Sequence, residues 1–186
     1  MDTAYGHSDT GLEHPQYKAC CETITDYEAD RTYCRHDMEH FLRVGQIAIL
    51  LAKENGLSID AEEIMLAALF HDLGRALQYQ NGISHAESSA ILAEEILLSI
   101  GYDPAKTDRI CAAVKCHSKR QDVKIRYAKR GSQKTLEDLL SFADHFSREC
   151  FACLASDTCK WKAEERIDRP YFEIKEDYDI RKRGLL

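Results

Sequence analysis

The strongest constraint on this chain is an apolar run that ends in an imidazole and a carboxylate. Residues 67–75 read Ala-Ala-Leu-Phe-His-Asp-Leu-Gly-Arg. His71 and Asp72, at the end of a buried helix, can both reach one cation, and Gly74 just beyond them lets the chain turn away. His-Asp is a common dipeptide, so the interpretation depends on where the other histidines and carboxylates fall.

Helical periodicity dominates the sequence, which has only three prolines and nine glycines in 186 residues. We expect helices over residues 16–31, 36–53, 60–72, 84–100, 103–117 and 135–148. Asp60 is expected to cap the third of these, and Ser84 and Glu87 to form a capping box at the start of the fourth. Residues 1–15 are polar and aperiodic, so they are expected to be loosely ordered.

Several of these helices turn a histidine or a carboxylate toward the interior. His40 leads a stripe that continues through apolar residues four, seven and eleven positions later, and a histidine there can also be a satisfied core residue. His85 and His117 occupy similar inward positions on two later helices. Asp144 lies on the apolar stripe of the last helix, where a lone carboxylate is costly unless it is paired or metal-bound.

Together these residues resemble the HD-domain phosphohydrolase superfamily, whose helical fold carries the pattern His…His-Asp…Asp. His40, in the context His-Phe-Leu-Arg-Val, matches the first histidine, His71-Asp72 matches the central pair, and Asp144 matches the distal aspartate. The match covers residues 34–148. It implies an all-α HD-domain helical bundle of about five to seven helices.

The resemblance also implies a domain organisation. Residues 16–150 are expected to form the HD domain, and residues 151–186 a C-terminal cysteine-containing extension. Residues 164–186 show little amphipathic helical pattern, so they are expected to pack as extended chain.

His85 and His117 extend the match to a binuclear branch, which is similar to YqeK-type dinucleoside tetraphosphatases and HD-GYP phosphodiesterases. There two added histidines hold a second metal ion. Six nitrogen and oxygen ligands would suit two divalent ions bridged by Asp72, and the mixture of imidazole and carboxylate suits Fe, Mn, Ni, Co or Zn. Two such ions would activate a water molecule for attack on a phosphoryl group.

The resemblance implies a metal-dependent phosphohydrolase, either a phosphomonoesterase or a phosphodiesterase or pyrophosphohydrolase. Its substrate would be a nucleotide or another phosphorylated small molecule. A di-iron oxygenase of the same fold and a non-catalytic domain that senses a nucleotide or a metal are the alternatives. The complete ligand set argues against the sensor, because degenerate sensors usually lose ligands.

Basic residues near the expected site are candidates for phosphate binding. Arg75 would hold the substrate and offset transition-state charge, or it would form a surface salt bridge. Lys119 and Arg120 begin a basic stretch over residues 119–134 that steers an anionic substrate or is only a solvated loop. His36 is either a partner or extra ligand of the site, or an exposed residue at a helix start.

Three of the eight cysteines follow the last expected helix at short spacing. Cys150, Cys153 and Cys159, with Cys34 as the candidate fourth ligand, resemble a structural zinc or iron–sulfur site. Separate buried thiols are the alternative for these positions, and the favoured one for Cys20 and Cys21 of the first helix.

The bulk properties limit the partners of the chain. A formal net charge of −7 argues against a general or stable nucleic-acid partner. We expect no membrane helix and no signal peptide, hence a cytoplasmic protein with reduced cysteines. The substrate is left open within the phosphorylated small molecules, and so is a homodimer.

Overall fold

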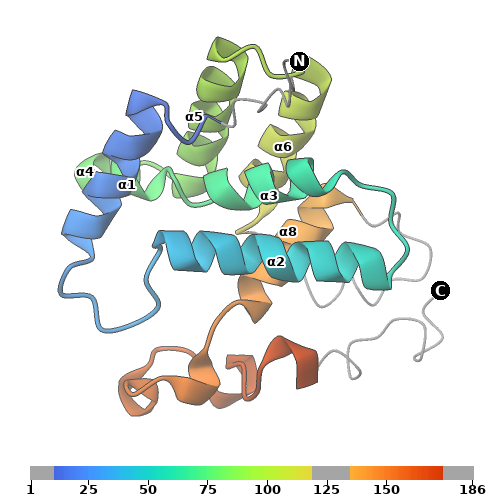
Figure 1. Ribbon diagram of the computed structural model, residues 1–186. Coiled ribbons are helices and arrows are strands. Elements are labelled where there is room, and N and C mark those ends of the chain that lie inside the picture. The colour runs from blue at the N-terminus through green and yellow to red at the C-terminus, as the bar shows by residue number, and fades with distance from the viewer. Residues whose placement is uncertain (1–10, 119–134, 174–186) are drawn as a thin grey trace, which may run out of the picture.

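A computed structural model describes residues 11–118 and 135–173 of the chain (Figure 1). These residues contain no strand, which confirms the expected all-α fold. They form the helices α1 (Pro15–Tyr27), α2 (Met38–Glu54), α3 (Ala61–Phe70), α4 (Arg75–Asn81), α5 (His85–Ser99), α6 (Pro104–Cys116) and α8 (Leu136–Phe146). Three short 3-10 turns follow: η2 (Cys150–Ala152), η3 (Ser156–Thr158) and η4 (Ala163–Glu165).

The helices pack as two antiparallel pairs with further helices around them. The connected helices α2 and α3 lie side by side, and α5 and α6 form the second pair against α3 (Figure 1). Helix α8 crosses behind α2 and also contacts α6, while α1 and α4 pack together at one end. The apolar faces of all these helices meet in one core that includes Phe41, Phe70, Ile96, Ile110 and Leu140, and α4 contributes Ala76.

The C-terminal extension packs onto the same core. Ile167 and Tyr171 are buried members of the core cluster, and the Tyr171 hydroxyl donates to Glu54 Oε2 at 3.1 Å. The Tyr171 ring also lies 6.1 Å from that of Phe146 at the end of α8. The described part of the extension includes η4 and three helical residues at 171–173, where extended chain was expected.

Several expected helix boundaries differ in the structure. Helix α2 begins at Met38 instead of residue 36, because the Asp37 side chain accepts a hydrogen bond from the His40 backbone N–H at 2.9 Å and so caps the helix. The first helix ends at Tyr27, four residues earlier than expected. Helix α4 is absent from the expected helices; it ends at Gly82, whose φ of 72° is positive.

Of the two helix caps predicted from the sequence, the structure confirms one and contradicts the other. Asp60 caps α3 as expected, by accepting from the Glu62 N–H at 3.0 Å. The capping box expected at the start of α5 is wrong, because the Ser84 side chain makes no capping hydrogen bond there.

Near the N-terminus, residues 11–14 form a turn closed by a hydrogen bond from His14 N–H to the Gly11 carbonyl, and residues 1–10 lie outside the described part. Among the described helices, none has the length and apolar character needed to cross a membrane.

Candidate metal centre

The structure brings six predicted ligands from five helices to one place. His40 lies in the first turn of α2, and His71 ends α3, directly before Asp72. The other three likewise lie near helix ends: His85 at the start of α5, His117 at the end of α6 and Asp144 in the last turn of α8. Because each helix directs one end to the same point, side chains far apart in the sequence converge.

Asp72 lies between two groups of histidines. Its Oδ2 atom is 3.3 Å from His71 Nε2 and 3.9 Å from His40 Nε2. Its Oδ1 atom is 3.5 Å from His85 Nε2 and also 3.5 Å from His117 Nε2. The two oxygens of one buried carboxylate therefore face two different pairs of imidazoles, as a bridging ligand requires.

Asp144 completes the side of the site formed by His40 and His71. Its Oδ1 atom is 3.5 Å from His40 Nε2 and 3.9 Å from His71 Nε2, and the two Nε2 atoms are 3.2 Å apart. Among the described residues three groups are compact enough to hold an ion, and they share members. They are His40 with His71 and Asp72; His71 with His117 and Asp144; and Asp72 with His85 and His117.

Backbone contacts fix the orientation of two of these rings. His71 Nδ1 is 2.6 Å from the Ala68 carbonyl, and His117 Nδ1 is 2.6 Å from the Val114 carbonyl. A carbonyl can only accept, so each Nδ1 carries the proton and each Nε2 presents its lone pair to the site. Each carbonyl lies three residues earlier at the end of the same helix, so the helix terminus itself orients its histidine.

The electrostatics of the site suit a divalent cation. Burial lowers the pKa of His40 and of His85 to about 4, which leaves both imidazoles neutral near pH 7. Burial raises the pKa of Asp72, but the neighbouring imidazoles of His71 and His36 outweigh this effect and hold the pKa well below its usual range. Within the described residues, His85 Nε2 is a buried nitrogen with no hydrogen-bond partner. The neutral imidazoles of His40 and His85, the ionised carboxylate of Asp72 and the unused lone pair of His85 are donors of the kind that a metal ion needs.

His36 belongs to the site, although it lies outside α2. Its Nε2 is 3.6 Å from Asp72 Oδ2, and its Nδ1 is 2.5 Å from Oε1 of Glu28, a buried carboxylate just after α1. Of the two alternatives for His36, the structure favours the partner or extra ligand over the exposed residue. The Tyr79 hydroxyl also donates to Glu28, and Arg31 lies 3.3 Å from it.

Glu28 was missed from the sequence. Burial raises its pKa, but the hydrogen bonds from His36 and Tyr79 outweigh this effect and lower the pKa to about 2. Its position among charged residues at a helix end gave no sign that it would be buried.

Gly74 brings the His71-Asp72 turn against the start of α5. A Cβ atom at this position would lie 2.3 Å from the His85 carbonyl oxygen and 2.5 Å from the Ser89 nitrogen, and the Gly74 N–H donates to Ser89 Oγ at 2.8 Å. Its φ of −68° is open to any residue. The chain turns at Gly74 as expected, but the glycine is required by this close backbone approach to α5 and not by a special backbone angle.

The site opens into a cavity of about 680 Å³ that is lined by several cationic side chains. Arg75 lies at its edge, where its Nε donates to Asp72 Oδ1 at 3.0 Å and its Nη1 to Gln78 Oε1 at 2.8 Å. Further lining side chains that the sequence did not single out are Arg31, Arg35, Arg148, Lys160, Tyr33 and Trp161. The predicted substrate residues Lys119 and Arg120 lie outside the described residues.

Comparison with known proteins identifies the family of this fold. A family model for the HD domain matches residues 37–149. The chain therefore belongs to the HD domain family, which confirms the expected superfamily.

Individual relatives add little about function. An uncharacterized protein of Clostridium beijerinckii (strain ATCC 51743 / NCIMB 8052) is 32% identical over 146 residues, which cover 78% of this chain and 86% of the relative. A 1.45 Å crystal structure of a predicted HD superfamily hydrolase from an uncultured Thermotogales bacterium matches with a TM-score of 0.59. It is 22% identical and the match covers 94% of this chain and 91% of that one, so this likeness concerns the fold.

Proposed function

We propose that the protein is a metal-dependent phosphohydrolase acting on a nucleotide or another phosphorylated small molecule. The observation that carries this proposal is the position of Asp72 between two pairs of histidines at the wall of an open cavity. His40, His71 and Asp144 would hold one divalent ion, and His85 and His117 the second, with Asp72 shared. Bound ions of this kind polarise a phosphoryl group and lower the pKa of a bound water molecule.

The chain itself supplies the groups that bind and orient a phosphorylated substrate. The cavity volume of about 680 Å³ is typical of sites for small molecules. Arg31, Arg35 and Lys160 reach its wall from the loop before α2 and from the C-terminal extension. These cations would bind the non-reacting phosphate oxygens and bring the substrate to the ion site with its reacting phosphoryl group foremost.

Arg75 is proposed to act at the reacting phosphoryl group. Its guanidinium holds Asp72 through Nε and lines the cavity, so one cation both fixes the shared carboxylate and faces the substrate. As a group fixed before the substrate arrives, it would stabilise charge that develops on the phosphoryl oxygens. The structure therefore favours this role over a surface salt bridge.

Phosphate release from a panel of nucleotides and simple phosphoesters tests the proposal. The protein would be loaded anaerobically with Mn²⁺ or Fe²⁺, and wild type compared with Asp72→Asn, which keeps the side-chain volume but removes the charge. We expect release by wild type and a loss of more than about 100-fold in the variant, because the removed ligand serves both ions. Asp108→Asn, at an exposed position on α6, is the matched control and should keep full activity.

Two results would contradict the proposal. One is the absence of phosphate release by fully metallated wild type across the panel; oxygen consumption by the iron-loaded protein would then favour the oxygenase alternative. The other is release that persists in Asp72→Asn at the rate of the control variant, which would place the activity elsewhere.

A further inference from the structure

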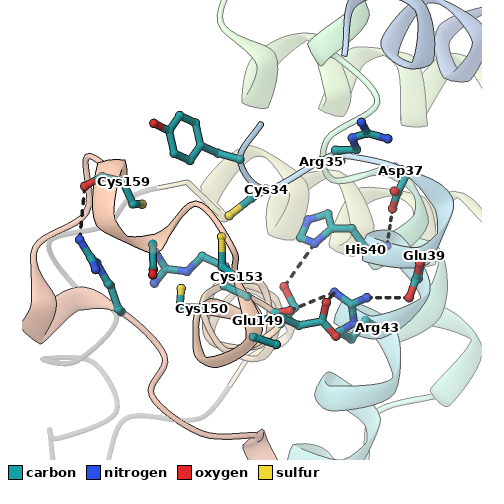
Figure 2. A pocket seen from close by; sticks show the side chains of 16 residues that line it. Cys34, Arg35, Asp37, Glu39, His40, Arg43, Glu149, Cys150, Cys153 and Cys159 are labelled. Carbon is teal, nitrogen blue, oxygen red and sulfur yellow. Dashed lines mark hydrogen bonds and ion pairs between the residues drawn. The ribbon is translucent and has the colours of Figure 1, made fainter. Parts of the chain in front are cut away.

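Four of the eight cysteines surround a second, smaller cavity next to the metal centre. Cys34 lies on the loop before α2, and Cys150, Cys153 and Cys159 lie on the turns that follow α8 (Figure 2). The cavity has a volume of about 270 Å³. The remaining cysteines, on α1 and α6, do not line it. Segments separated by more than a hundred residues thus contribute thiols to the lining of one cavity.

Tight backbone turns hold three of these cysteines in place. The Cys153 N–H donates to the Cys150 carbonyl at 3.3 Å, and the Cys159 N–H to the Ser156 carbonyl at 3.2 Å. Cys150 therefore begins the 3-10 turn η2, while Cys153 and Cys159 directly follow η2 and η3. Short turns of this kind let closely spaced cysteines bind one metal centre.

A hydrogen bond between two distant segments of the chain holds Cys34 at the same cavity. The hydroxyl of Tyr33 donates to the Thr158 carbonyl at 2.8 Å and lies 3.0 Å from the Thr158 hydroxyl. Tyr33 and Thr158 are the direct neighbours of Cys34 and Cys159. The contact therefore ties the two segments together at the position of their cysteines, although Cys34 is itself exposed and has no packing role in the core.

Four arginines outnumber three carboxylates around the thiols, and two of these carboxylates, Glu39 and Glu149, pair with Arg43. Arg35, Arg43, Arg148 and Arg166 line the cavity, and Arg166 donates to the Cys159 carbonyl at 3.4 Å. Cys34 is exposed as a residue, but partial loss of solvent around its sulfur raises the pKa of the thiol. The nearby Cys150 raises this pKa further and Arg148 opposes both effects, so these groups are electrostatic neighbours. Cysteines bind metals as thiolates, and nearby guanidinium groups offset the negative charge that four thiolates bring together.

The spacing of the thiols favours a cluster over a single ion. A zinc ion bonded to four sulfurs at about 2.3 Å places these sulfurs about 3.8 Å apart. Among the described residues, no three cysteine sulfurs lie within 4.8 Å of one another, although the histidine and aspartate groups do meet that limit. An iron–sulfur cluster distributes its thiolates over several iron atoms, so it needs wider spacing and a cavity between the sulfurs.

We infer that Cys34, Cys150, Cys153 and Cys159 hold an iron–sulfur cluster that joins the C-terminal extension to the HD domain. The site is distinct from the histidine and aspartate centre but adjoins it, because His40 lines both cavities. Ser147, three residues before Cys150, has its Oγ 3.3 Å from His40 Nδ1. Lys160 follows Cys159 directly, so the cluster would also fix the backbone that carries this cation to the larger cavity.

Measurement of acid-labile sulfide tests the inference. The full chain would be purified anaerobically and reconstituted with iron and sulfide, and its iron and sulfide contents and visible absorption recorded. We expect bound sulfide and a broad visible absorption in wild type. Sulfide is the decisive readout because ions at the histidine and aspartate centre carry none, and it is independent of whether the protein hydrolyses phosphoesters.

Single substitutions locate the cluster. Cys34→Ser and Cys153→Ser should each lower bound sulfide by about fivefold or more, and the exposed position of Cys34 makes its loss compatible with an intact fold, checked by circular dichroism. Cys111→Ser, at a thiol on α6, is the matched control and should retain the wild-type sulfide content. Zinc without sulfide at the four cysteines would overturn the inference. So would the absence of sulfide from reconstituted wild type, or equal sulfide in Cys34→Ser and the control.

Discussion

Asp72 and Glu28 are both buried carboxylates, but their different neighbours indicate different roles. Asp72 has imidazoles at both oxygens, so it is placed to bind ions directly. Glu28 reaches Asp72 only through His36, whose ring lies between them with one nitrogen toward each carboxylate. A carboxylate behind a histidine fixes the orientation of the ring and increases its basicity, and Tyr79 and Arg31 hold Glu28 itself in place.

Glu28→Gln is therefore expected to weaken metal binding without abolishing it. The amide keeps the shape of the side chain but removes the negative charge that orients His36. We expect an affinity for Mn²⁺ about tenfold lower, measured by calorimetric titration of the metal-free protein. Asp30→Asn, two residues away and exposed, is the control. Equal affinities in the two variants would show that His36 does not act on the ion site.

The convergence of the six proposed ligands could be predicted because each lies on, or at the end of, an apolar helical stripe. A helix that buries Val44 and Leu51 must bury His40 as well, so the periodicity alone gave its direction. Glu28 and His36 follow no such rule, since both lie in the segment between α1 and α2. Their contact depends on the path of that connection, which the sequence pattern does not determine.

Among the elements, the turn between α3 and α4 controls the distance between the two halves of the site. It carries Asp72, and it approaches the α5 backbone so closely at Gly74 that no Cβ atom fits. Helix α5 in turn starts with His85. A change in this approach would therefore move His85 relative to Asp72, although neither residue had been altered.

Gly74→Ala is expected to destabilise the protein by about 3 kcal/mol, because the added methyl group overlaps backbone atoms that cannot rotate away. The measurement is urea-induced unfolding of the metal-free protein. Gly82→Ala is the matched control: its φ is positive at 72° but no atom lies within 4 Å of the added Cβ, so the expected cost is about 1 kcal/mol. A smaller cost at Gly74 than at Gly82 would contradict the close approach.

The same turn shows where local sequence signals fail. The sequence predicts that Gly74 lets the chain turn away after His71-Asp72, which requires only local backbone freedom, whereas its close approach to α5 depends on a distant segment. Helix α4 was missed for a related reason. It is seven residues long and, apart from Ala76, its side chains are at most half-buried, so it offers little of the apolar period by which the longer helices were found.

At the scale of the whole molecule, the HD domain and the C-terminal extension form one packed unit. The family model ends at residue 149, yet Ile167 and Tyr171 lie in the common core. The extension also supplies Lys160 and Trp161 to the larger cavity and three of the four clustered cysteines to the smaller one. All these contacts join segments that are far apart in the sequence. Only the grouping of the four cysteines was indicated by the sequence, through the short spacing of the last three.

The most direct test of the two-ion centre is a crystal structure of Mn²⁺-loaded protein with anomalous diffraction at the manganese edge. We expect two peaks per chain, one at each oxygen of Asp72. The first peak should lie beside His40, His71 and Asp144, and the second beside His85 and His117. A single peak, or two peaks of which neither contacts Asp72, would contradict the bridging role of this carboxylate and with it the proposed hydrolytic centre.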